Sequence, residues 1–211
     1  MSGGRPRSSA AAKAGSAAPQ SKTHGAPRMA PREVRIIGGQ WKRSKLPVAD
    51  RPGLRPTPDR VRETLFNWLG QDLDGWRVLD AFAGSGALGF EAASRGATEV
   101  LLLERDAELA RSLNASKVRL KADTLRVESS DALAWMARCA PARFELVLLD
   151  PPFQQDLFLP ALRAALPLLV PDGLVYLESG EPIVAPEELG LEVWRSGKAG
   201  AVHFQVFRRK G

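Results

Sequence analysis

The sequence predicts an α/β fold in which helices pack on a mostly parallel β-sheet. Two observations predict it. From Trp76 onward, short apolar runs alternate with helical patterns, and the earliest runs are continuously apolar, as in Val100-Leu101-Leu102-Leu103. Strands of this kind are buried on both faces, and their alternation with helices is typical of a parallel, doubly wound sheet.

Three segments are predicted along the chain. Residues 1–33 are mainly Ala, Ser, Gly, Pro and basic residues. They cannot bury enough apolar surface to offset the entropy of ordering, so we expect a disordered basic tail. Residues 34–75 are expected to form a basic extension, and residues 76–211 the domain that contains the sheet.

The predicted elements follow in chain order. In the extension, residues 34–37 and 45–48 are expected to pair as a β-hairpin. A helix follows, with Thr57 as its N-cap and Pro58 at its first helical position. The predicted strands of the domain are 77–81, 99–104, 125–128, 145–150, 173–178, 192–195 and 202–208, and its predicted helices are 87–95, 107–120, 132–139 and 157–168. No helix separates the last two strands, so we expect an antiparallel hairpin at one edge.

Composition excludes several classes of protein. Of the 211 residues, 44% are hydrophobic and 26% are charged, which is ordinary for a globular domain. No apolar run approaches the roughly 18 residues that span a bilayer, and no apolar leader is present, so we expect a cytoplasmic protein without a membrane partner. One cysteine and two histidines offer little for a disulfide or a metal site, so we expect no metal.

Positive charge is concentrated at the beginning of the chain. The first 62 residues hold 14 Lys and Arg but three Asp and Glu, a net charge of +11, whereas the remainder carries −5. Such asymmetry favours a polyanionic partner, because Lys and Arg displace counterions condensed on phosphates. Charge alone leaves open a solvated basic tail with no partner.

A glycine loop follows the first predicted strand of the domain. Gly84, Gly86 and Gly89 match G-x-G-x-x-G, which allows a tight turn and close approach of a ligand to helix N–H groups. A nicotinamide or flavin cofactor is the default interpretation. Asp80, however, would repel a pyrophosphate and could pair with an ammonium group, while Glu104 could accept from both hydroxyls of a ribose. These carboxylates favour S-adenosylmethionine, although Asp80 as a cap and Glu104 as a solvated strand end remain alternatives.

A second motif, Asp150-Pro151-Pro152-Phe153, follows another apolar strand. The two prolines end the strand and hold a rigid turn at the carboxyl edge of the sheet, where α/β folds bind ligands. Asp150 and the Pro151 carbonyl could accept hydrogens from an exocyclic amine, while Phe153 stacks on its ring. A turn with incidental chemistry is the alternative.

These motifs carry a family resemblance. The glycine loop followed by Asp-Pro-Pro-Phe resembles class I S-adenosylmethionine-dependent amino-methyltransferases. Three further strings resemble the bacterial ribosomal RNA small subunit methyltransferase D family: RIIGGQW at 35–41, LRPTPDRVRETLFNWL at 54–69 and FAGSGALG at 82–89. The resemblance covers residues 34 to about 208. It implies a Rossmann-like, mostly parallel seven-stranded sheet with an antiparallel edge hairpin, and methylation of the exocyclic N2 of one guanine (guanine-966 type) in 16S rRNA.

The resemblance also implies roles for individual residues. Asp131 falls where such enzymes contact the adenine amine, and a helix N-cap is its other interpretation. The set expected to bind the cofactor is Asp80, Phe82, Ala83, Gly84, Ser85, Gly86, Glu104, Arg105, Asp131 and Ala132. The set expected to hold the guanine is Asp150, Pro151, Pro152 and Phe153. We expect direct methyl transfer, with the target base extruded or single-stranded.

The basic extension is expected to grip the RNA backbone near the catalytic mouth. Trp41 could stack on a base, and packing onto the body is at least as plausible. The expected RNA-contacting residues are Arg35, Trp41, Lys42, Arg43, Lys45, Arg55, Arg60 and Arg62. We expect a monomer that acts on 16S rRNA, within an assembling or assembled small ribosomal subunit.

Three alternatives remain open. A DNA adenine-N6 or protein-glutamine methyltransferase uses related Asn/Asp-Pro-Pro-aromatic turns, but the Asp at 150 and the N-terminal strings disfavour both. A catalytically silent RNA-binding protein is disfavoured by the presence of Asp80, Glu104 and Asp150 together. An NAD-linked oxidoreductase rests on the glycines alone and ranks last.

Overall fold

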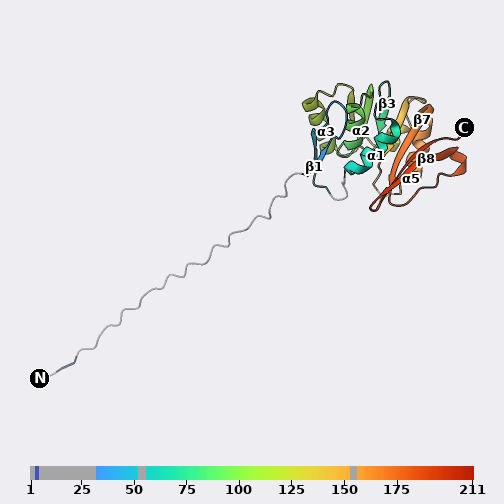
Figure 1. Cartoon of the computed structure of the whole chain (residues 1–211). Coiled ribbons are helices and arrows are strands. Elements are labelled where there is room, and N and C mark those ends of the chain that lie inside the picture. Colours follow the sequence, from blue (N-terminus) through green and yellow to red (C-terminus); the bar gives the residue numbers. More distant parts are fainter. Residues whose placement is uncertain (1–2, 5–31, 52–55, 153–155) are drawn as a thin grey trace. The chain divides into compact units, whose positions relative to one another are not determined.

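A seven-stranded sheet with the order β5-β4-β3-β6-β7-β9-β8 forms the centre of the computed structural model (Figure 1). The structure describes residues 3–4, 32–51, 56–152 and 156–211. The strands are β3 (Arg77–Asp80), β4 (Glu99–Glu104), β5 (Leu125–Ser129), β6 (Phe144–Leu149), β7 (Leu169–Ser179), β8 (Leu191–Ala199) and β9 (Val202–Arg209). Strands β3 to β7 pair in parallel, whereas β9 runs antiparallel to both β7 and β8. The predicted sheet and its edge hairpin are confirmed.

Helices cover both faces of this sheet. They are α1 (Asp59–Leu69), α2 (Ala87–Ser94), α3 (Ala107–Leu120), α4 (Ala132–Met136) and α5 (Phe158–Ala165), with short 3-10 helices η2 (Leu166–Leu168) and η3 (Glu187–Leu189). One apolar core joins α1, α2 and α3 to the sheet, and the other joins α4 and α5 to it. Successive residues of β4 alternate between these cores, Leu102 in the first and Leu103 in the second. Burial on both faces therefore explains the continuously apolar strands.

The extension begins with a two-stranded sheet. β1 (Arg32–Arg35) pairs antiparallel with β2 (Lys45–Val48), and Val34 lies opposite Leu46. Both side chains are buried in the core that contains α1. The first strand begins two residues earlier than predicted, and the Ile36 amide extends the pairing by donating to the Ser44 carbonyl (2.8 Å). Residues Pro31–Gly211 form one compact unit.

One predicted cap is wrong. Helix α1 begins at Asp59, with Pro58 in the N-cap position and no side-chain cap. Thr57 is buried, and its hydroxyl donates to the Glu178 carboxylate (Oγ1–Oε1 2.6 Å). The Thr57 hydroxyl, which the local pattern assigned to capping α1, therefore binds a residue that is distant in sequence.

Other element boundaries shift only slightly. Strand β7 starts four residues before its predicted beginning, and the helix predicted over 157–168 is divided into α5 and η2, where Pro167 lies in the first turn of the 3-10 helix. No helix within the described ranges has both the length and the apolar character that crossing a membrane requires.

Candidate functional site

Carboxylates gather at the carboxyl edge of the sheet. Asp80 ends β3, Glu104 ends β4, Asp150 directly follows β6 and Glu178 lies near the end of β7. Parallel pairing brings these strand ends together, since Asp80 lies opposite Leu148 in β6 and Leu149 lies opposite Leu177 in β7. Ligands of open α/β sheets bind outside such an edge. Four acidic residues from distant parts of the sequence therefore line one candidate site.

The glycine loop between β3 and α2 adopts a conformation that needs glycine. Gly86 precedes α2 with a φ of 78°, in the left-handed region, and a Cβ there would meet the Leu113 side chain at 2.6 Å. Gly89 sits in the first turn of α2, against Leu102 and the Asp80 carboxylate, which leaves no room for a side chain. Glycine at both positions thus lets the loop and the first turn of α2 pack closely against Leu113, Leu102 and Asp80. Phe82 and Ser85 are half-buried in the loop, and Ala83 is buried.

Asp80 is almost completely buried, and its Oδ2 accepts a hydrogen bond from the Gly89 amide (3.0 Å). Burial raises the pKa of this carboxyl to about 7, the Gly89 hydrogen bond opposes that rise, and the carboxylates of Glu104 and Glu178 add to it. At neutral pH the group is therefore balanced between its two protonation states. A cationic ligand group at this position would favour the charged form.

Glu104 connects the glycine loop to the end of β4. Its Oε2 accepts from the Gly84 amide (2.9 Å) and its Oε1 from the Asp106 amide (2.8 Å). Asp106 in turn caps α3, because its Oδ1 accepts from the Glu108 amide (2.8 Å). Arg105, between them, is exposed. Glu104 therefore lies at the site, orders the loop and is half-buried rather than a solvated strand end.

Asp131 lies beside Glu104. The amide of Ser130 donates to the Glu104 carbonyl (3.1 Å), and Asp131 begins α4 as its N-cap, with Oδ1 accepting from the Ala134 amide (2.9 Å). The carboxylate is exposed, and Ala132 is buried below it. The cap interpretation of Asp131 is confirmed, and its second carboxylate oxygen stays compatible with a ligand amine.

The Asp-Pro-Pro turn lies where the sequence predicted. Asp150 is half-buried directly after β6, Pro151 is buried and Pro152 is exposed, whereas Phe153 lies outside the described residues. Burial raises the pKa of Asp150 well above its ordinary value, and the neighbouring carboxylates of Glu178 and Asp80 raise it further. The turn therefore presents a carboxyl with unusual proton affinity at the centre of the edge.

Glu178 belongs to this site although sequence reasoning missed it. It is buried, and its Oε1 accepts from the hydroxyls of Thr57 (2.6 Å) and Tyr176 (2.9 Å). No motif marks the residue. Its position could have identified it, because Glu178 lies near the end of a central strand, as Asp80 and Glu104 do.

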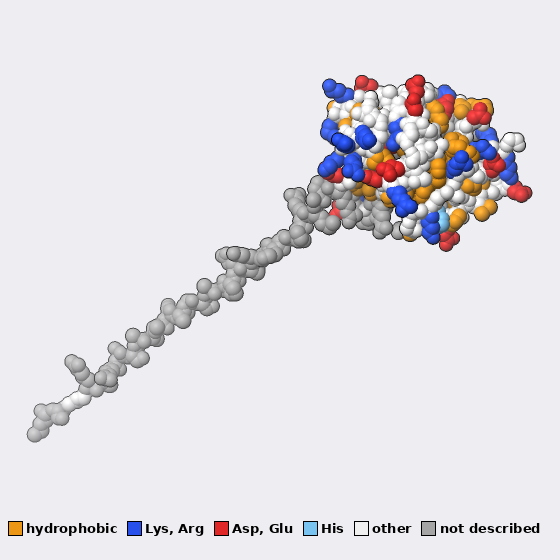
Figure 2. All heavy atoms as spheres, viewed as in Figure 1, with side chains coloured by type: hydrophobic (Ala, Val, Ile, Leu, Met, Phe, Trp, Pro, Cys, Tyr) orange, Lys and Arg blue, Asp and Glu red, His pale blue; other side chains and the backbone are white. Residues whose placement is uncertain are grey.

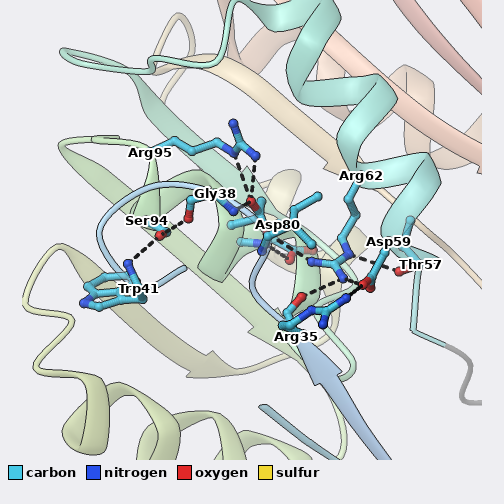
Figure 3. A network of polar contacts seen from close by, with 12 residues as sticks. Arg35, Gly38, Trp41, Thr57, Asp59, Arg62, Asp80, Ser94 and Arg95 are labelled. Atoms are coloured by element: carbon cyan, nitrogen blue, oxygen red, sulfur yellow. Dashed lines mark hydrogen bonds and ion pairs between the residues drawn. The ribbon is translucent and has the colours of Figure 1, made fainter. Parts of the chain in front are cut away.

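The basic extension contains one residue that cannot touch RNA. Arg62 is fully buried, pairs with Glu91 and Asp59, and donates to the carbonyls of Thr57 and Arg35 (Figure 3). Its prediction as an RNA contact is wrong, because the whole side chain lies inside the protein. The exposed members of the predicted set are Arg35, Lys42, Arg43, Lys45 and Arg60; Arg55 lies outside the described residues.

The turn of the hairpin lies away from the glycine loop. The Trp41 amide donates to Ser94 Oγ (2.9 Å), and Ser94 ends α2, whereas the glycine loop precedes the same helix (Figure 3). Trp41 is half-buried against the core, which favours the packing interpretation. Figure 2 shows Lys and Arg side chains gathered on the side of the molecule where β1 and α3 lie. RNA held there would have to extend along α2 to reach the carboxyl edge.

Comparison with known proteins gives consistent matches over this chain. The family model described as Conserved hypothetical protein 95 matches residues 34–208. Ribosomal RNA small subunit methyltransferase D of Escherichia coli K12 is 43% identical over 84% of this chain and 91% of its own length. The Haemophilus influenzae protein of the same name is 39% identical over 83% of this chain and 94% of its own length.

Solved structures agree with these sequence matches. The Escherichia coli protein yhhF superposes with a TM-score of 0.75 at 40% identity and covers 85% of this chain and 99% of its own. The Thermus thermophilus 16S rRNA N2 G1207 methyltransferase, solved with S-adenosylmethionine and guanosine, superposes with a TM-score of 0.63 at 25% identity. That match covers 86% of this chain and half of the Thermus chain.

Proposed function

The chain belongs to the ribosomal RNA small subunit methyltransferase D family, and from that premise we propose that it methylates the exocyclic N2 of one guanine (guanine-966 type) in 16S rRNA. S-adenosylmethionine would be the methyl donor. The substrate would be 16S rRNA within a small-subunit particle or its precursor, which would place the protein in the cytoplasm. The Asp150-Pro151-Pro152 turn beside buried Glu178 is the observation on which the proposal depends.

The residues at the carboxyl edge fit the proposed cofactor. Gly84 and Ser85 of the glycine loop are half-buried beside Glu104, so a ligand could approach the loop backbone there. Asp80 would pair with the ammonium group and thereby recover its charge, Glu104 would accept from ribose hydroxyls, and Asp131 would accept from the adenine amine. When bound, this cofactor supplies a methyl group on a cationic sulfur.

Asp150 and Pro151 would prepare the acceptor. The lone pair of a guanine amino group is delocalised into the ring, which makes the amine a poor nucleophile. Hydrogen bonds from its N–H groups to the Asp150 carboxylate and the Pro151 carbonyl would localise the lone pair and aim it. Alignment of this kind can supply about 7–11 kcal/mol of the barrier reduction, and a buried site strengthens the electrostatic part. The base must leave its stack to enter such a site.

The guanine assignment has independent support. The Thermus relative, whose name specifies N2 of a 16S rRNA guanine, was solved with guanosine bound. Its fold covers most of this chain. A carboxylate next to a proline carbonyl offers two acceptors to one amino group, which suits an amine that carries two hydrogens.

The test is methyl transfer from isotopically labelled S-adenosylmethionine into naked 16S rRNA and into unmethylated small-subunit particles, with the nucleosides resolved by mass spectrometry. We expect label in N2-methylguanosine, and none with the Asp150→Ala variant that still binds the cofactor. The better of the two substrates identifies the assembly stage. Cofactor binding without label in any RNA would overturn the proposed acceptor, and the search would turn to DNA and protein.

A further inference from the structure

Glu178 of β7 and Asp150, directly after β6, are neighbours at the carboxyl edge of the sheet. Leu149 of β6 lies opposite Leu177 of β7, the last pair in the register of these strands. Asp150 and Glu178 are the residues that follow this pair, and the charge of Glu178 acts on Asp150. Neighbouring strands lie roughly 4.8 Å apart, and continuing the alternation of each strand by one residue places both side chains on the same face of the sheet. Two carboxyl groups therefore lie side by side at the place where the proposed amine binds.

The protein holds Glu178 in one orientation. The hydroxyls of Thr57, just before α1, and Tyr176, on β7 itself, both donate to Oε1, at 2.6 and 2.9 Å. Oε2 takes no part in these two hydrogen bonds. The side chains of Tyr176 and Thr57 are both buried, so water does not compete with their hydroxyls for Oε1. The arrangement fixes a buried carboxyl beside Asp150, with one of its oxygens satisfied by hydroxyls.

Charged groups from three other parts of the fold face Glu178. Asp150 follows β6 and Asp80 ends β3, so two further carboxyls face the same edge, whereas Arg62 of α1 supplies a positive charge. His203 of β9 lies opposite Ser179, the residue after Glu178. Because side chains alternate along a strand, His203 points to the face of the sheet opposite to Glu178. Burial raises the pKa of Glu178, and the two hydroxyls and Arg62 lower it. Asp150 and Glu178 therefore both bind a proton more readily than an exposed carboxyl does.

Methylation of an amino group releases a proton that a buried site must accept. The carbon–nitrogen bond forms from the amine lone pair while the carbon–sulfur bond breaks, its electron pair remaining on sulfur. The nitrogen–hydrogen bond then breaks, and its electron pair returns to nitrogen. We propose that Glu178 receives this proton through Asp150, so that Asp150 regains its charge and can bind the next amine. The proposal rests on the proposed function and makes Glu178 a positioning residue, since it acts through Asp150.

The first experiment compares Glu178→Gln with Glu181→Gln, an exposed glutamate three residues away, in the pH dependence of kcat on RNA. The wild-type rate should rise with pH as the carboxyl pair ionises. In Glu178→Gln we expect the plateau kcat to fall about 100-fold, as for loss of a general base. Its acid limb should move to lower pH by about one unit, because Asp150 loses a like-charged neighbour. Affinity for S-adenosylmethionine should stay almost unchanged, because Glu178 is outside the set expected to bind the cofactor, and Glu181→Gln should match the wild type.

A second variant moves the profile in the other direction. Thr57→Val removes one hydroxyl that stabilises the charged form of Glu178, so the acid limb should shift to higher pH. Tyr176→Phe removes the other hydroxyl and should act in the same sense. A role limited to packing would not produce opposite shifts in Glu178→Gln and Thr57→Val.

A readout without RNA or cofactor tests the same group. Because the pKa of Glu178 is raised by folding, its contribution to stability is present below its unfolded pKa and is lost as pH rises through the folded value. The unfolding temperature of Glu178→Gln relative to the wild type should therefore rise from pH 4 to pH 8. A flat difference, together with an unshifted acid limb in both Glu178→Gln and Thr57→Val, overturns the inference. A wild type that fails to methylate guanine N2 overturns the proposed function instead.

Discussion

Arg62 Nη1 lies 3.0 Å from Glu91 Oε2, and neither side chain is exposed to solvent. This ion pair joins α1 to α2. The same carboxylate accepts from the backbone amides of Ile37 (2.9 Å) and Gly38 (2.7 Å), and Arg62 donates to the Arg35 carbonyl (2.8 Å). The segment after β1 is thus held to the body by a buried polar network that includes Arg62 and Asp59 (Figure 3).

Loss of this ion pair should destabilise the whole fold. We expect Arg62→Met to lower the free energy of unfolding by about 3 kcal/mol, the lower end for a broken buried pair, because Arg95 still neutralises Glu91. Arg60→Met, two residues away and exposed, should leave the free energy of unfolding almost unchanged. Urea denaturation of both variants measures the difference. Equal midpoints would show that Arg62 is dispensable to folding.

The buried carboxyl of Asp80 should destabilise the fold at neutral pH, although we expect it to bind the cofactor. Its folded pKa of about 7 is above the unfolded value, so its contribution to stability is present below about pH 4 and is lost as pH rises through 7. Asp80→Asn should therefore gain in unfolding temperature relative to the wild type between pH 5 and pH 8. It should also lose affinity for S-adenosylmethionine by calorimetry. Asp123→Asn, at an exposed position, is the control and should change neither quantity. A cofactor affinity that survives Asp80→Asn would remove Asp80 from the binding set.

Two glycines with the same backbone angle separate strain from packing. Gly86 has a φ of 78° and Gly75 a φ of 79°, but a Cβ at Gly75 meets no atom within 4 Å, whereas one at Gly86 meets Leu113 and Phe90. Gly75→Ala should cost about 1–2 kcal/mol from the left-handed conformation alone. Gly86→Ala should cost about 1–3 kcal/mol more, from overpacking, and should weaken cofactor binding. Chemical denaturation measures both costs, and equal values would contradict the crowding of the loop.

The exposed charges of the hairpin should control the salt dependence of RNA binding. Charge reversal of Lys42, Arg43 and Lys45 together should weaken RNA binding and flatten the plot of log K against log salt, by up to roughly 0.9 in slope for each phosphate that the protein no longer neutralises. Lys198→Glu, on β8 at the edge strand of the sheet, is the control for general charge effects. Filter binding or fluorescence anisotropy at several salt concentrations makes the comparison. An unchanged slope in the triple variant would mean that RNA does not bind to this surface.

Local pattern was sufficient for most of the fold. The bounds predicted for β4 and α3 are those observed. Strand β4 is one apolar run with an acidic residue at each end, and α3 is one helical pattern that begins after its N-cap, Asp106. Asp80, Glu104 and Asp150 were also identified from sequence, since each is an acidic residue at the end of an apolar strand next to a recognisable turn. Their shared position follows from parallel pairing, which sequence also predicts.

Only the folded chain revealed the remaining parts of the site. Thr57 and Glu178 are separated by 121 positions, so no local signal shows that the hydroxyl serves Glu178 instead of capping α1. Arg62 follows exposed Arg60 by two residues, yet it lies inside the protein, where Glu91 of α2 neutralises it. Long-range packing decides which charges are buried, because burial depends on what packs against a side chain and not on its neighbours in sequence. That is why the pattern identified the motifs, whereas the tertiary structure assigned Glu178 to the site and removed Arg62 from the RNA surface.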